Sequence, residues 1–187
     1  MKKGLLIIFS GPSGVGKGCV RAKLFEKDDL NLAYSISMTT RGIRIGETDG
    51  KDYFFVSQER FKQAIDNDEL LEYATFVSNS YGTPKFYVEK LRNEGKNVVL
   101  EIEINGAKQV MEKCKDAISI FLVPPSLEEL RHRIEGRKTE PKEVIDQRMA
   151  TAEKELQQTN IYTHVVVNDD VDRCANEVAD IIRNYIK

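Results

Sequence analysis

The sequence predicts an α/β fold, a three-layer core whose central sheet is mostly parallel. Apolar runs of strand length recur along the chain, and such runs are typical of strands that are covered on both faces. Helical patterns separate these runs, and strands that alternate with helices pair in parallel. With 187 residues, of which 41% are hydrophobic, the chain has the size and composition of one globular domain.

The expected strands and helices alternate in a regular order. Buried strands are predicted at residues 5–9, 97–104, 117–123 and 164–168, where apolar residues dominate. Helices are predicted at residues 17–27, 84–93, 105–115, 126–135, 140–158 and 171–186. Pro84 suits a first helical position, and Ser126 opens "SLEE", a capping box that marks the start of a helix.

One segment, between residues 33 and 83, interrupts this order. Its strand-like stretches, "YSIS", "DYFFV" and "LLEYATF", are short and half-polar, and tyrosines, arginines and glycines cluster around them. We expect a small lobe inserted into the core. A second interruption, "EGRKTEP" at residues 135–141, is rich in charge and joins two predicted helices.

Charge and cysteine content exclude several functional classes. The formal net charge is −2, so no bulk field attracts nucleic acid or an anionic membrane. Cys19, Cys114 and Cys174 are far apart and form no CxxC pair, which argues against disulfides and zinc. No apolar run is long enough for a secretory signal or a membrane span. We therefore expect a cytoplasmic protein with no nucleic-acid or membrane partner.

A phosphate-binding loop, or P-loop, follows the first predicted strand. The stretch "GPSGVGKG" lies between a buried strand and a helix, which is the context that such a loop requires. Gly11 and Gly16 allow the backbone amides to turn inward and form an anion site at the helix N-terminus. Lys17 can reach the terminal phosphates of a nucleotide. The alternative is an incidental glycine-rich turn.

The loop departs from the common pattern at its metal ligand. A Ser or Thr usually follows the lysine and binds Mg²⁺, but here Gly18 and Cys19 follow. Mg²⁺ bound with a nucleotide is therefore expected to be held mainly by phosphates and water, with no metal ligand assigned in the chain. We interpret Cys19 as a small packed residue, and a reactive thiol is the alternative.

A second anion site is expected in the inserted lobe. Arg41 and Arg44 lie three residues apart in a glycine-rich stretch, and Tyr53 follows in a strand-like run. Arginine forks bind phosphate oxygens in a bidentate way, and a tyrosine hydroxyl adds a neutral donor. Two loop arginines are often only solvated surface, but a nucleotide phosphotransferase needs a second site for its acceptor.

Glu72 and Thr83 form a candidate pair for reading a nucleobase. A carboxylate accepts from N1–H and the exocyclic amino group of guanine, and a hydroxyl donates to O6. Adenine offers the opposite pattern, so the wrong base would leave buried polar groups unpaired. The alternative is that Glu72 is exposed on a half-polar strand.

Together these residues resemble guanylate kinase over essentially the full chain. The markers, in the order of the family, are "GPSGVGKG", "TTRGIRIGETDGKDY", "ELLEYATF", "YGT", "LEIEINGA", "PPSLEELRHRIEGRKTE" and "VVVNDD". The resemblance implies transfer of the γ-phosphoryl of ATP to GMP or dGMP in purine nucleotide metabolism. It also implies a core at residues 1–33, 84–125 and 151–187, a GMP-binding lobe at 34–83 and a helical lid at 126–150.

The resemblance also assigns roles by position. The implied ATP-binding residues are Gly11, Pro12, Ser13, Gly14, Val15, Gly16, Lys17, Gly18 and Cys19, with Asn168 near the adenine. The implied phosphate ligands for GMP are Arg41, Arg44, Tyr53 and Tyr81, and the implied guanine readers are Ser37, Glu72, Thr83 and Glu103. The implied catalytic residues are Lys17, Arg41, Arg44, Arg137 and Arg148.

The chain departs from the family pattern at two further positions. Glu103 stands where aspartate is usual, and Asn105 stands where glutamine is common. On a continuous strand, Glu101 and Glu103 would face the same way. Two alternatives remain: a kinase for another nucleoside monophosphate, and a non-catalytic guanylate-kinase-like binding module. The retained lysine and arginines favour the enzyme, as a monomer or a homodimer.

Overall fold

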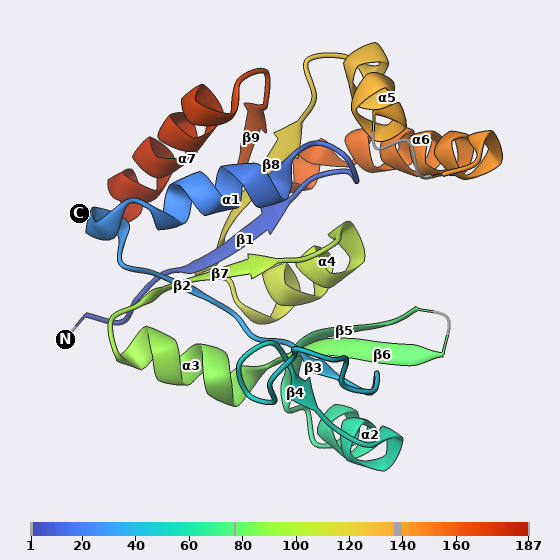
Figure 1. Cartoon of the computed structure of the whole chain (residues 1–187). Helices are drawn as coiled ribbons and strands as arrows, with labels where there is room; N and C mark the ends of the chain where they lie inside the picture. The colour runs from blue at the N-terminus through green and yellow to red at the C-terminus, as the bar shows by residue number, and fades with distance from the viewer. Residues whose placement is uncertain (1, 77, 137–139, 187) are drawn as a thin grey trace. The chain divides into compact units, whose positions relative to one another are not determined.

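The structure is a computed structural model that describes residues 2–76, 78–136 and 140–186 (Figure 1). The chain forms two compact units. The first unit comprises Met1–Leu6 and Leu32–Ala117, and the second comprises Ile7–Asn31 and Ile118–Lys187. Among the described residues, no helix is both long and apolar enough to cross a membrane.

Three parallel strands form the centre of the second unit. They are β1 (Leu6–Ser10), β8 (Ile118–Val123) and β9 (His164–Val167), with Ile7 opposite Ile118 and Ile120 opposite His164. All five residues of β1 are buried, as expected for a strand that is covered on both faces.

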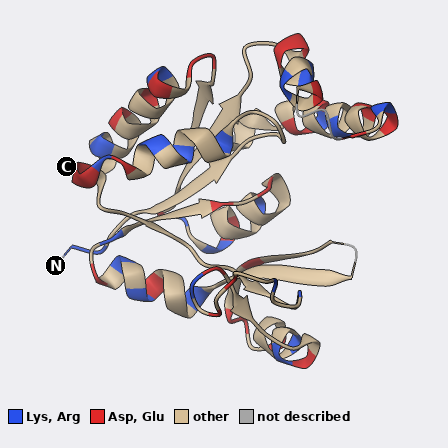
Figure 2. Cartoon of the chain, viewed as in Figure 1, with Lys and Arg blue, Asp and Glu red and all other residues tan. Residues whose placement is uncertain are grey.

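The helices of this unit pack in two pairs. Helix α1 (Lys17–Phe25) packs against α7 (Val171–Ile186), and α5 (Leu127–Glu135) packs against α6 (Lys142–Leu156) around Leu130, Ile134 and Met149. Two short 3₁₀ helices, η1 (Asp28–Leu30) and η2 (Thr159–Ile161), complete the unit. Acidic and basic residues are interspersed along α6 and α7 (Figure 2).

The first unit contains a parallel strand pair with two helices and a separate antiparallel region. Strand β2 (Leu32–Tyr34) pairs with β7 (Asn97–Glu101), and α3 (Lys85–Asn93) and α4 (Ile104–Lys113) belong to the same unit. A four-stranded sheet has the order β4-β3-β6-β5. Its strands are β3 (Met38–Thr39), β4 (Phe54–Phe55), β5 (Leu70–Phe76) and β6 (Asn79–Pro84).

The α/β class and the parallel pairing are confirmed, and most predicted elements lie within two residues of their expected ends. Ser126 caps α5 as predicted, since its side chain accepts from the N–H of Glu129. The limits of the lobe and the lid stay predictions.

The predicted strand at residues 97–104 is wrong at its end. Strand β7 stops at Glu101, and Ile104 already begins α4, with Glu103 as the N-cap residue. The buried side chain of Ile104 belongs to the helix, so the apolar alternation that suggested a longer strand combines two elements. Glu101 and Glu103 are therefore not neighbours on one strand face.

Two features of the inserted segment also differ from the expectation. In "YSIS" only Tyr34 belongs to a strand. Helix α2 (Gln58–Asp66) was not predicted, although Ser57 caps it and the buried residues Phe61 and Ala64 are three apart. These residues pack against Met38 and Leu70 of the small sheet, which is a contact that local sequence does not reveal.

Gly4 makes a close approach that leads to a stability prediction. A Cβ atom at Gly4 would lie 1.8 Å from the carbonyl oxygen of Lys96, so Gly4→Ala must force the backbone apart. We expect a loss of about 1–3 kcal/mol in the free energy of unfolding, which is a drop of several degrees in thermal midpoint. The control is Gly18→Ala, since no heavy atom lies within 4 Å of that Cβ. Equal midpoints for the two variants would contradict the prediction.

Candidate active site

In the second unit, the loop between β1 and α1 approaches its neighbours too closely for side chains. Gly16 is the N-cap of α1 and has φ +96°, a conformation that favours glycine. A Cβ at Gly16 would lie 2.7 Å from Nδ2 of Asn168, and one at Gly11 would lie 2.8 Å from the carbonyl oxygen of Leu122. The loop thus ends at a helix N-terminus, where backbone N–H groups have no partner within the helix and attract anions.

Two cationic side chains lie at this loop. The Nζ atom of Lys17 donates to the carbonyl oxygens of Gly11 at 2.5 Å and Pro12 at 3.3 Å. Arg148, from α6, donates to the hydroxyl of Ser13 and forms an ion pair with Glu140. Lys17 and Arg148 therefore both lie at the predicted ATP-binding loop. Arg137, the other predicted lid residue, lies outside the described residues.

Asn168 supports the loop from a buried position. Its side chain is 2% exposed, and Nδ2 donates to the carbonyl oxygen of Val15 at 2.7 Å. Arg133 of α5 donates to the carbonyl oxygens of Asn168 at 3.0 Å and Val15 at 3.3 Å. Arg133 was not predicted as a site residue, although it follows the buried Leu130 by three residues, which puts an arginine next to the apolar face of α5.

A cavity of about 650 Å³ lies in the first unit, a size typical of small-molecule sites. Five of the predicted GMP ligands line it: Ser37, Tyr53, Glu72, Tyr81 and Glu103. Three others, Arg41, Arg44 and Thr83, are not among the lining residues. Glu47, Asp52, Glu101 and Gly106 are among the other lining residues, which were not predicted as ligands.

Glu72 is the buried carboxylate of this cavity. Its Oε1 atom accepts from the hydroxyl of Thr83 at 2.6 Å, because the pairing of β5 with β6 places these residues opposite each other. Glu72 is 7% exposed. Burial raises its pKa, the hydrogen bond from Thr83 opposes this shift, and the charge of Glu103 adds to it. The hydroxyl of Thr83 thus donates its hydrogen bond to Glu72, whereas we expected it to donate to a base.

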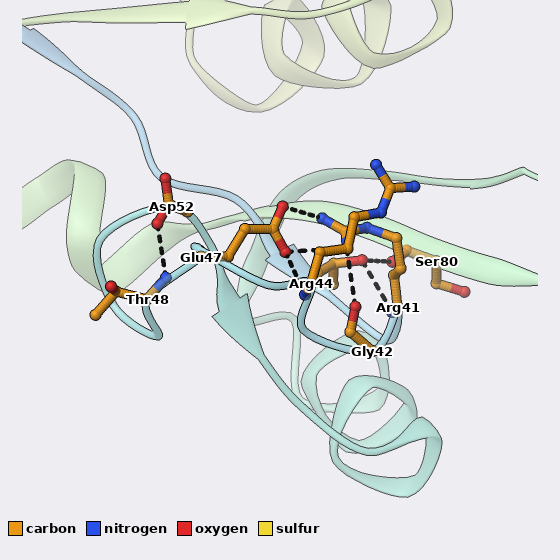
Figure 3. A network of polar contacts seen from close by, with 8 residues as sticks. Arg41, Gly42, Arg44, Glu47, Thr48, Asp52 and Ser80 are labelled. Atoms are coloured by element: carbon orange, nitrogen blue, oxygen red, sulfur yellow. Dashed lines mark hydrogen bonds and ion pairs between the residues drawn. The ribbon is translucent and has the colours of Figure 1, made fainter.

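Arg41 forms a bidentate ion pair with the carboxylate of Glu47 (Figure 3). Its Nη2 and Nη1 atoms lie 2.7 Å and 3.0 Å from the two carboxylate oxygens of Glu47. The backbone N–H of Arg44 donates to the same carboxylate at 2.8 Å. Arg41 lies over the ring of Tyr53 and lowers the pKa of Glu47 through their hydrogen bonds. The lobe therefore has a geometry that binds an oxyanion with two or more oxygens.

Comparisons with known proteins show the family of this chain. The guanylate kinase family model matches residues 3–185. The chain belongs to the guanylate kinase family. It is 52% identical over 183 residues to a guanylate kinase of Lactiplantibacillus plantarum, covering 98% of this chain and 89% of the relative. It is 53% identical over 181 residues to a guanylate kinase of Lactococcus lactis subsp. lactis, covering 97% and 88%.

Solved structures share the fold of this guanylate kinase family member. The crystal structure of guanylate kinase from Anaplasma phagocytophilum superposes with a TM-score of 0.74 at 34% identity, covering 98% of this chain and 87% of that one. The structure of TT1252 from Thermus thermophilus has a TM-score of 0.55 at 17% identity and covers both chains in full. This second likeness concerns the fold alone.

The burial of Glu72 leads to a prediction about stability and pH. Because its pKa is raised in the folded state, the unfolded chain loses this proton at a lower pH than the folded chain does. Stability therefore falls as the pH rises from the ordinary value toward the raised pKa, and it levels off above that pKa. Glu72→Gln removes the charge and keeps an acceptor for Thr83. The thermal midpoint of the variant minus that of the native chain should therefore increase as the pH rises from about the ordinary glutamate value of 4.5. Circular dichroism melts across this range provide the measurement, and a difference independent of pH would contradict it.

Proposed function

We propose that this chain transfers the γ-phosphoryl group of ATP to GMP or dGMP and forms ADP and GDP or dGDP. The observation that carries the proposal is the cavity that contains the buried Glu72 carboxylate and adjoins the Arg41 fork. A nucleoside monophosphate needs these two chemistries, one for the base and one for the phosphate.

In the acceptor site, Glu72 accepts from N1–H and the amino group of guanine. Thr83 orients Glu72 through its hydrogen bond, and Ser37 and Glu103 contribute further polar groups that line the cavity. A base without matching donors leaves the carboxylate unpaired, which costs far more than losing an apolar contact. These residues therefore determine the choice of guanine.

The acceptor phosphate binds to the second group of lobe residues. Arg41 and Arg44 supply guanidinium donors, and Tyr53 and Tyr81 supply hydroxyl groups at the cavity wall. The carboxylate of Glu47, held by Arg41 and by the N–H of Arg44, marks where an oxyanion fits. We assign residues 34–83 to this GMP-binding lobe.

In the donor site, the loop from Gly11 to Cys19 binds the ATP phosphates through its amides. Asn168 supports the loop conformation through its hydrogen bond to the carbonyl oxygen of Val15, and Arg133 donates to the carbonyl oxygen of Asn168. Lys17, with Arg148 and Arg137 of the lid at residues 126–150, neutralises charge that develops on the transferring phosphoryl group. Phosphoryl transfer depends on such positioning and electrostatic stabilisation more than on covalent chemistry.

Mg²⁺ accompanies ATP in this proposal, and its ligands come from the nucleotide. Gly18 has no side chain to bind the ion, and Ser13 is hydrogen-bonded to Arg148. Within the described residues, no group of three or more His, Cys, Asp or Glu side chains is placed to hold a metal. In this proposal phosphate oxygens and water would hold the ion, which would supply positive charge to the β- and γ-phosphates.

The experiment that tests the proposed function is a coupled assay of ADP release. Mg²⁺–ATP is supplied with GMP, dGMP, AMP, CMP or UMP in turn. Turnover confined to GMP and dGMP is expected, because only guanine offers two donors to Glu72. Turnover with AMP would overturn the base-reading part. No turnover, in a folded protein that still binds GMP, would favour a non-catalytic binding module.

Lys17→Ala tests the donor site. Removing this cation from the loop should lower kcat by roughly 10²–10³-fold, the magnitude typical of one lost group that stabilises transition-state charge. Lys62→Ala, which removes an exposed lysine of α2, is the matched control and should keep full turnover. Near-native turnover of Lys17→Ala would rule out the assigned mechanism.

A further inference from the structure

One face of α4 lies against the outer edge of β5, the strand that carries Glu72. Strand β5 ends the order of the four-stranded sheet, so one of its backbone edges lacks a strand partner in that sheet. Helix α4 packs against this strand. Gly106, Gln109 and Lys113 of α4 lie three and four residues apart and therefore share one face of the helix.

The side chains of this face bind the backbone of β5 directly. Gln109 accepts from the N–H of Tyr73 through Oε1 and donates to the carbonyl oxygen of Tyr73 through Nε2, both at 3.1 Å. Lys113 donates to the carbonyl oxygen of Leu70 at 2.8 Å. These bonds flank Glu72 on both sides along the strand. The primary amide of Gln109 thus takes the place of a neighbouring strand.

Gly106 faces the carboxylate of Glu72 itself. A Cβ atom at Gly106 would lie 2.8 Å from Oε2 and 3.3 Å from Cδ of Glu72. An ordinary van der Waals contact needs about 3.4 Å or more. The absence of a side chain at position 106 therefore leaves the space that Oε2 occupies, while Thr83 holds Oε1 from the opposite strand.

We propose that Gly106 and Gln109 are positioning residues for base recognition: Gly106 leaves the space into which the Glu72 carboxylate fits, and Gln109 fixes the stretch of β5 that carries it. The inference rests on the proposed role of Glu72 in reading guanine. Gly106 and Gln109 act on the acceptor base through Glu72 and leave the ATP site unaffected.

Gly106→Ala is the first test. The added methyl group displaces Oε2, so KM for GMP should rise about ten-fold or more, as expected when a hydrogen bond to a charged group is weakened. KM for ATP should stay within about two-fold. Alanine favours a helix over glycine, so a loss of GMP affinity without a lower thermal midpoint separates positioning from damage to the fold. An unchanged KM for GMP would overturn the proposal.

A double-mutant cycle shows whether Gly106 acts through Glu72. Gly106→Ala is combined with Glu72→Ala, and KM for GMP is measured for both single variants and for the pair. Since Glu72→Ala removes the carboxylate, adding Gly106→Ala to it should cause no further change. An equal Gly106→Ala effect in both backgrounds would refute the inference. If Glu72→Ala alone leaves KM unchanged, the proposed role of Glu72 fails, and the inference fails with it.

Gln109→Ala provides a test that does not add volume to the cavity. Losing both bonds to Tyr73 should raise KM for GMP several-fold while KM for ATP is retained. Glu112→Ala, an exposed position on the same helix, is the matched control and should leave both constants unchanged. Inosine monophosphate, which lacks the exocyclic amino group, adds a second readout: the preference for GMP over it should fall in both Gly106→Ala and Gln109→Ala. Preserved preference together with an unchanged KM would reject the positioning role.

Discussion

The buried carboxylate of Glu72 is the constraint around which the first unit is arranged. An ionised group in an apolar environment is expensive unless its oxygens have partners. Strand β6 supplies the hydroxyl of Thr83 for one oxygen, and α4 approaches the other at Gly106. The pKa of Glu72 is raised because the hydrogen bond from Thr83 offsets burial only in part. The remaining hydrogen-bonding capacity is what a ligand with two donors can use.

In the second unit, backbone atoms of the loop between β1 and α1 form the corresponding binding feature. Gly11 and Gly16 let the loop approach Leu122 and Asn168 closely, and no side chain fits at either contact. Asn168 donates to the carbonyl oxygen of Val15 in the loop, and Arg133 donates to the carbonyl oxygen of Asn168. The loop leads into the N-terminus of α1, and a helix N-terminus attracts anions. In both units, a missing side chain is as informative as the polar groups around it.

Sequence patterns predicted the features that depend on neighbours along the chain. The strand, loop and helix around Lys17 and the cap at Ser126 are local, and their positions follow from residue order. Glu72 and Thr83 were chosen from their chemistry as a candidate pair for reading a base, and the strand register places them opposite each other. The hydrogen bond between them was not predicted. Long-range contacts were missed. Arg133 is separated from its partner Val15 by 118 positions in the sequence, and Gln109 is separated from Tyr73 by 36. A local sequence pattern therefore predicts neither contact.

The pair between Arg41 and Glu47 has a consequence for how the lobe meets anions. Arg41 is already neutralised by a carboxylate of its own chain, with its side chain 12% exposed. Such a cation contributes little to the field at a distance, and five carboxylates line the adjoining cavity: Glu47, Asp52, Glu72, Glu101 and Glu103. A phosphate that binds Arg41 therefore either displaces Glu47 or binds beside it. These carboxylates oppose the approach of an anion, so salt that screens the repulsion should increase the rate of encounter with this lobe.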